Sequence, residues 1–147
     1  IREGLELAAQ HGVPRAVRAF ISEHHGTGSI SYFLEKAKER DGSVNAADFT
    51  YPGPRPQSAE TAVAMLADGV EAAVRVLNEP NADRVREVVR HIMKQRMDQG
   101  ELRDAPVTLR QLDTIEREFT RVLAGMYHNR IEYPAASGGV TSEFAST

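Results

Sequence analysis

Two adjacent histidines, His24 and His25, begin the sequence HHGTG and are the residues best suited to chemistry. Helical spacing places His24 in line with Val17 and Phe20, on the face of a helix that is predicted to point inward. An interior imidazole needs a hydrogen bond or a metal ion, and His25 lies about a quarter turn away, so the two rings could flank one pocket. A hydrogen-bonded core histidine followed by a surface histidine at a helix C-terminus explains the same residues equally well.

Asp68 is the second candidate, because it is the only charged residue between Glu60 and Glu71. The surrounding run is apolar or small, so the sequence predicts a carboxylate in a poorly solvated position. Such a carboxylate is costly unless it is paired, hydrogen-bonded or bound to a metal. Two roles for Asp68 meet this requirement: a metal ligand, or a partner in a buried salt bridge to an arginine of a neighbouring helix. The sequence does not decide between them.

The segment FTYPGPRPQS, residues 49–58, is too rich in proline to be helical and is predicted to be an ordered loop or connector. Within it, Arg55 could hold a phosphate and Tyr51 could stack on a base. Tyr32 and Lys36, one turn apart after the glycines, are comparable candidates for phosphate contacts. A rigid connector and ordinary surface side chains explain these four residues as well.

Composition narrows the classes of function. The 147 residues fit one compact domain or most of one, and the formal net charge of −3 gives no basic field for a DNA or RNA polymer. Because cysteine is absent, a metal would have to be held by His, Asp or Glu, which favours a hydrolytic site over a structural zinc site. No apolar run reaches the roughly 20 residues that cross a bilayer, so this segment is expected to be soluble.

Apolar residues recur at helical spacing along almost the whole chain, which predicts an all-α domain. Ser58 and Thr108 are predicted to cap helices, since both side chains can accept a hydrogen bond from a free backbone N–H. The predicted helices cover about 2–11, 14–24, 30–42, 58–77, 82–99 and 108–131. In the last helix the side chains expected to point inward are Leu109, Leu112, Ile115, Phe119, Val122 and Leu123.

The two ends of the chain lead to further expectations. Ile1 begins in helical register without a Met or a capping residue, which suggests a cut inside a longer polypeptide. The last residues, 135–147, lack a core-forming pattern and are predicted to form a flexible tail after a domain at 1–134.

Three blocks of the sequence resemble successive signatures of one family: HHGTGSISYFLEKA, DFTYPGPRPQSAETAVAMLADGVEAA and YHNRIEYP. The family is that of the HD-superfamily metal-dependent phosphohydrolases, and the similarity is to the cytoplasmic HD domain of its seven-transmembrane-helix receptors. The studied members of this group are cyclic di-AMP phosphodiesterases. The resemblance runs in order from Ile1 to Pro134 and implies the C-terminal portion of a compact multi-helix HD fold that lacks its N-terminal helices.

The resemblance also implies a two-metal centre, with iron or manganese as the divalent ions. It assigns His24, His25 and Asp68 as metal ligands and catalytic residues. The namesake His-Asp pair and the other ligand histidines of the family would lie upstream of Ile1. Two divalent cations can activate a water and stabilise the charge that develops at phosphorus, so no Ser or Cys nucleophile is required.

The implied function is hydrolysis of cyclic di-AMP to pApA by an enzyme that is anchored to a membrane through an upstream region, with this domain on the cytoplasmic face. A homodimer is compatible with this expectation. Two alternatives stay open: an HD phosphohydrolase that acts on another nucleotide, and a catalytically inactive domain for nucleotide sensing or interaction. An intact upstream His-Asp pair would favour the enzyme.

Overall fold

The computed structural model describes residues 1–29, 39, 45 and 49–128. The helices in order are α1 (Arg2–Gln10), α2 (Arg15–Glu23), α4 (Ala59–Arg75), α5 (Ala82–Asp98) and α6 (Leu109–His128). In this part of the chain the only β-type pairing is one isolated bridge between Ser29 and Thr50, so the all-α prediction is confirmed. Apart from Glu39, the predicted helix over 30–42 falls outside the described residues, as do the predicted tail, Tyr32 and Lys36.

Polar side chains fix the starts of the long helices. Ser58 accepts a hydrogen bond from the Thr61 N–H, and the Thr61 hydroxyl accepts from the Ser58 N–H, which is a reciprocal capping box. At the start of α6, Thr108 and Gln111 make the equivalent exchange. The predicted caps at Ser58 and Thr108 are therefore confirmed, because both satisfy backbone donors that a helix leaves free in its first turn.

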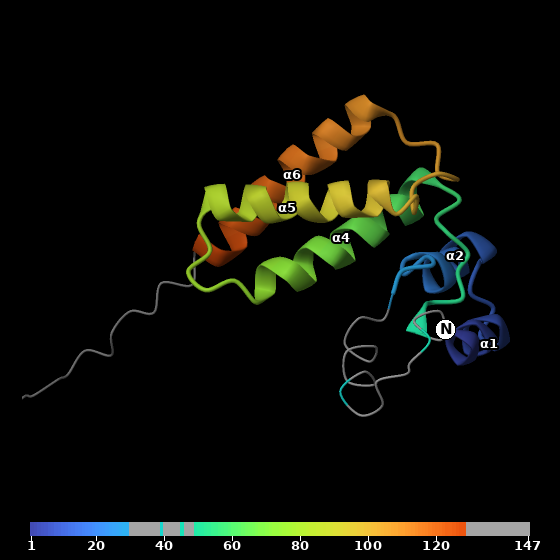
Figure 1. Ribbon diagram of the computed structural model, residues 1–147. Helices are drawn as coiled ribbons and strands as arrows, with labels where there is room; N and C mark the ends of the chain where they lie inside the picture. The colour runs from blue at the N-terminus through green and yellow to red at the C-terminus, as the bar shows by residue number, and fades with distance from the viewer. Residues whose placement is uncertain (30–38, 40–44, 46–48, 129–147) are drawn as a thin grey trace, which may run out of the picture.

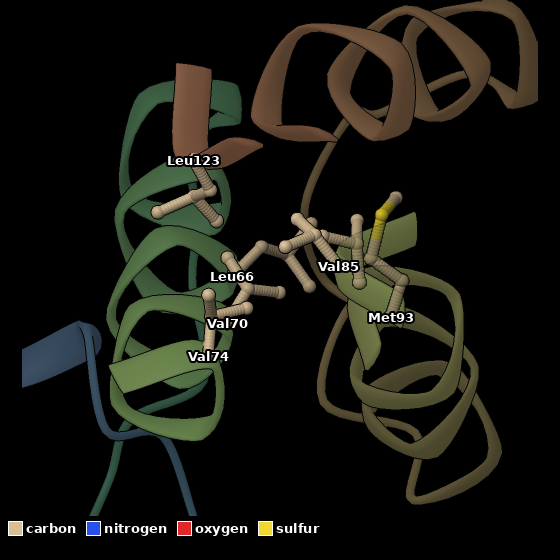
Figure 2. Close-up of a cluster of buried hydrophobic side chains, with 7 residues drawn as sticks. Leu66, Val70, Val74, Val85, Met93 and Leu123 are labelled. Carbon is tan, nitrogen blue, oxygen red and sulfur yellow. The ribbon is translucent and has the colours of Figure 1, made fainter. Parts of the chain in front are cut away.

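Helices α4, α5 and α6 lie against one another and enclose the hydrophobic core (Figure 1, Figure 2). The core side chains come from all three helices: Leu66, Val70, Val74, Val85, Val89, Met93 and Leu123. Leu112, Ile115 and Phe119 of α6 are partly buried against this cluster, as their spacing predicts. The prediction is wrong for Leu109 and Val122, which are exposed: Leu109 stands in the first turn of α6, and Val122 is rotated off the stripe that ends in Leu123.

Helices α1 and α2 pack together beside the N-terminal end of α4 (Figure 1). Their apolar faces are incompletely covered, since Leu7, Val17 and Phe20 are exposed. The prediction that Val17 and Phe20 point into the interior is therefore wrong for the described chain, because none of its elements packs over them. Among the described helices, none is both long and apolar enough to cross a membrane.

Candidate functional site

The histidine pair lies in a tight turn that directly follows α2. Nδ1 of His24 is 2.6 Å from the carbonyl oxygen of Phe20. Since a carbonyl only accepts hydrogen bonds, this Nδ1 must carry the proton, which leaves Nε2 of neutral His24 with a free lone pair. The ring is half-buried rather than interior, because the face of α2 that it continues is itself exposed. The geometry thus fits a ligand histidine whose other nitrogen is fixed by a backbone group.

The proline-rich loop brings Tyr51 against the histidine pair. The Tyr51 N–H donates to the carbonyl of Gly28 over 3.0 Å, next to the bridge between Ser29 and Thr50. The ring of Tyr51 stacks on His25 with centroids 4.2 Å apart and planes inclined by 17°, and His25 in turn is 3.8 Å from His24. Three rings from two segments therefore form one cluster, and Tyr51 holds the plane of His25.

Asp68 of α4 faces the same cluster. Its Oδ2 lies 3.8 Å from Nδ1 of His25, so the structure brings the two candidate ligands together. The predicted burial of Asp68 is wrong: its side chain is 56% exposed, because the small residues around it leave this side of α4 open. In the described chain no arginine lies within 4.0 Å of this carboxylate, so the buried arginine salt bridge is not formed.

The surroundings of His25 favour its neutral form. Burial, reinforced by the adjacent His24 and by Arg96, lowers the pKa of His25, while the carboxylate of Asp68 opposes this shift. The contact between His25 and Asp68 is therefore not a full ion pair at neutral pH. A neutral imidazole beside a carboxylate is the protonation state that a divalent cation requires of its ligands.

A divalent metal fits this cluster in ligand type and in pair spacing. Ligand atoms of one such ion lie about 2.0–2.2 Å from it, so two of them are about 3–4 Å apart. The Nδ1–Oδ2 separation of 3.8 Å between His25 and Asp68 is within this range. Among the described residues, however, no group of three or more His, Cys, Asp or Glu converges on one point. The described residues therefore present a pair of ligand types at metal-compatible spacing and not a complete ligand set.

Two buried glutamates hold the histidine turn in place, although nothing in the sequence pattern sets them apart from the other glutamates of the chain. Glu23, which immediately precedes the histidines, is 8% exposed and accepts from the Thr61 hydroxyl at 2.7 Å and the Gln57 N–H at 2.9 Å. These bonds fasten the end of α2 to the start of α4. Because Glu23 is one of many charged residues along the chain, only the tertiary contacts identify its role.

Glu101, in the turn after α5, is the second of these residues and is 2% exposed. Its carboxylate accepts from the Thr27 N–H at 3.0 Å and from the Thr27 hydroxyl at 2.5 Å. Gly26 permits this approach: its φ is +56°, and a Cβ there would overlap the Glu101 carboxylate and lie 2.6 Å from Met65 Cε. The histidine turn is thus held from two sides, by Glu23 and by Glu101.

Arg55 lies on the same loop as Tyr51, and its buried Nε has no hydrogen-bond partner among the described groups. A separate groove of about 620 Å³ lies between α2 and the N-terminal end of α4. Phe20, Glu23 and Gln57 are among the residues that line it. None of His24, His25, Tyr51 and Asp68 lines this groove. We therefore place the candidate site at the ring cluster, where the donor atoms gather.

Comparison with known proteins relates the chain to one group, although no family model matches it. It is 37% identical over 135 residues to the cyclic-di-AMP phosphodiesterase PgpH of Bacillus subtilis and 35% identical over 133 residues to that of Listeria monocytogenes. An uncharacterized protein of Synechocystis is 42% identical over 152 residues. These matches cover 90–100% of this chain but only 18–19% of the relatives, so the chain spans about a fifth of their length.

Solved structures give the same relationship. The HD domain of L. monocytogenes PgpH in complex with cyclic di-AMP superposes with a TM-score of 0.80 at 33% identity. The same domain in a second structure gives a TM-score of 0.78 at 34% identity. Each match covers 86% of this chain and 59% of the solved chain.

Proposed function

Because the chain resembles part of the PgpH HD domain in sequence and in fold, we propose that it belongs to a metal-dependent phosphodiesterase that hydrolyses cyclic di-AMP to pApA. The observation that carries the proposal is the meeting of His25 and Asp68 at 3.8 Å, with His24 in ring contact. Similarity to an HD domain solved with cyclic di-AMP supports the nucleotide as substrate. The expected catalytic portion is 1–134, with a tail at 135–147.

In the proposed reaction His24, His25 and Asp68 would hold divalent ions, with iron and manganese as the expected metals. Bound divalent ions supply an activated water and offset the negative charge that develops at phosphorus. His24 would offer Nε2, because Nδ1 is engaged with the Phe20 carbonyl. His25 is ready to bind because its pKa is lowered, and Tyr51 keeps the ring in one plane.

In the hydrolysis the oxygen of a water bonds to one phosphorus of the cyclic dinucleotide and the P–O3′ bond of that phosphodiester breaks. A proton from the water ends on the leaving 3′ oxygen, which gives linear pApA with a 5′-phosphate. Tyr51 and Arg55 are the described residues proposed to contact substrate, and Tyr32 and Lys36 are proposed with them from the sequence alone. We further propose that the whole protein is anchored to a membrane by a region outside this chain, with the domain on the cytoplasmic face. A homodimer would be compatible with this placement.

The test uses a chain extended upstream to the full length of the solved HD domain. We expect about two metal ions per chain, as in two-metal hydrolases, and conversion of cyclic di-AMP to pApA. Loss of a group that only supports a metal ligand typically lowers activity by roughly 10–100-fold. Because Asp68 is proposed as a ligand itself, Asp68→Asn should lower turnover by more than this and should also reduce the metal content. Asp113→Asn, on the exposed surface of α6, is the matched control and should leave both unchanged.

Each other outcome has a defined meaning. Full turnover by the Asp68→Asn variant would remove Asp68 from the site. Metal without cleavage of cyclic di-AMP would point to another nucleotide phosphate as substrate. Neither metal nor turnover in the parent chain would favour a domain for sensing or interaction.

A further inference from the structure

Arg96, near the C-terminal end of α5, reaches into the gap between the histidine turn and α4. A Cβ on Gly28 would lie 2.8 Å from its Nη1, and a Cβ on Gly69 would lie 3.9 Å from its Nε and Nη2. Gly28 belongs to the turn that carries His25, and Gly69 directly follows Asp68. Gly28 thus leaves the space that Nη1 of the guanidinium occupies, while a side chain at Gly69 would be in ordinary van der Waals contact with Nε and Nη2.

The charge of Arg96 is not compensated within the described chain. Its Nε is buried without a hydrogen-bond partner among the described groups, and its Nη1 donates to the Gln99 side chain at the long distance of 3.5 Å. By contrast, Arg90 on the same helix pairs with Glu116 at 2.6 Å. A partly buried guanidinium with free donors is costly, and an anion that enters the site would relieve that cost.

Two further arginines of the described chain are comparable with Arg96. Arg18 and Arg55 likewise have a buried Nε without a partner in the described chain. Arg18 lines a hollow with residues of α1 and α2, none of which is His24, His25 or Asp68, and Arg55 is already a candidate from the sequence. Of these three arginines, Arg96 is the one that lies beside both Gly28 and Gly69.

We propose that Arg96 is a substrate-binding residue, whose guanidinium donates hydrogen bonds to a phosphate oxygen of the phosphodiester held at His24, His25 and Asp68. This inference rests on the proposed phosphodiesterase function. A guanidinium suits the role because its planar array of N–H donors can engage two oxygens of one phosphate at once. Arg96 would complement the metal ligands by binding a different part of the same anion.

The test compares Arg96→Met, which keeps an apolar stem but removes every donor, with Arg96→Lys, which keeps the charge but loses the planar fork. Arg90→Met on the same helix is the matched control. All are made in the extended, metal-loaded chain. Kinetics of cyclic di-AMP cleavage are measured together with metal content, melting temperature and the Kd of a non-hydrolysable phosphorothioate analogue.

We expect Arg96→Met to lower kcat/KM and to weaken analogue binding by about 10–100-fold, the loss typical of one or two charged hydrogen bonds. Arg96→Lys should recover part of both losses, and Arg90→Met should match the parent. Metal content should stay at the parent value in every variant, because Arg96 is not a ligand. If Arg96→Met alone proves unstable, the intermediate affinity expected of Arg96→Lys still decides.

Parent-level kcat/KM and Kd in both Arg96 variants would overturn the proposal while leaving the phosphodiesterase intact. A joint loss of melting temperature and metal content in both variants would also overturn it, since Arg96 would then only support the fold. If the parent chain itself neither binds the analogue nor cleaves cyclic di-AMP, the proposed function fails together with this inference.

Discussion

Helices α4, α5 and α6 pack through aliphatic side chains, whereas the α1–α2 pair joins this layer through buried carboxylates. In the first region seven hydrophobic side chains form a continuous core (Figure 2). In the second, Glu23 and Glu101 connect the end of α2 and the histidine turn to α4 and to the turn after α5. Aliphatic packing supplies most of the stability, while directional polar contacts fix where the candidate ligands stand.

This division is reasonable for a site that needs accurate geometry. Hydrophobic contacts are not directional, so they tolerate small shifts between helices. A carboxylate that accepts two hydrogen bonds from Thr27 fixes both the distance and the orientation of the turn. Loss of these bonds should lower the stability of the fold, because a buried charged acceptor without a partner is strongly unfavourable.

The largest effect is expected from Leu66→Ala in the core of α4. Removing a fully buried leucine should lower the free energy of unfolding by about 2–5 kcal/mol, measured by denaturant titration. Leu109→Ala is the matched control, because Leu109 is 79% exposed and its loss should change the value by less than about 0.5 kcal/mol. Equal effects of the two substitutions would contradict the assignment of the core.

An intermediate effect is expected at Thr27. Thr27→Val keeps the shape of the side chain but removes the hydroxyl that donates to Glu101, and should cost about 1–3 kcal/mol of unfolding free energy. Thr27→Ser keeps the hydroxyl and should cost less than about 1 kcal/mol. If valine and serine behaved alike, the bond to Glu101 would not be what holds the turn.

The smallest effect is expected on the exposed face of α2. Val17 is 53% exposed, so Val17→Thr, which keeps the branched shape, should change stability by less than about 0.5 kcal/mol. Thermal unfolding at several protein concentrations provides the measurement. A larger loss, or a melting temperature that rises with concentration only in the parent, would mean that this face is covered in solution.

Much of the helical framework follows from local sequence. Ser58 and Thr108 each precede a helix with a partner three residues later, and such caps act within one turn, so their roles are readable without a tertiary structure. Periodic apolar residues such as Leu66, Val70 and Leu123 likewise identify the inner faces, because burial follows helical spacing. The type and spacing of His24 and His25 also marked them as chemical candidates.

Tertiary structure alone decided how these elements meet. The sequence predicted a buried Asp68, but α4 presents it to an open side, opposite His25. It also predicted an inward face through Val17, which the described helices leave uncovered. Glu101 contacts Thr27, and Arg96 lies beside Gly28, although both partners are far away in sequence. Helical periodicity reports which residues share a face, but which element packs against that face depends on contacts between distant segments.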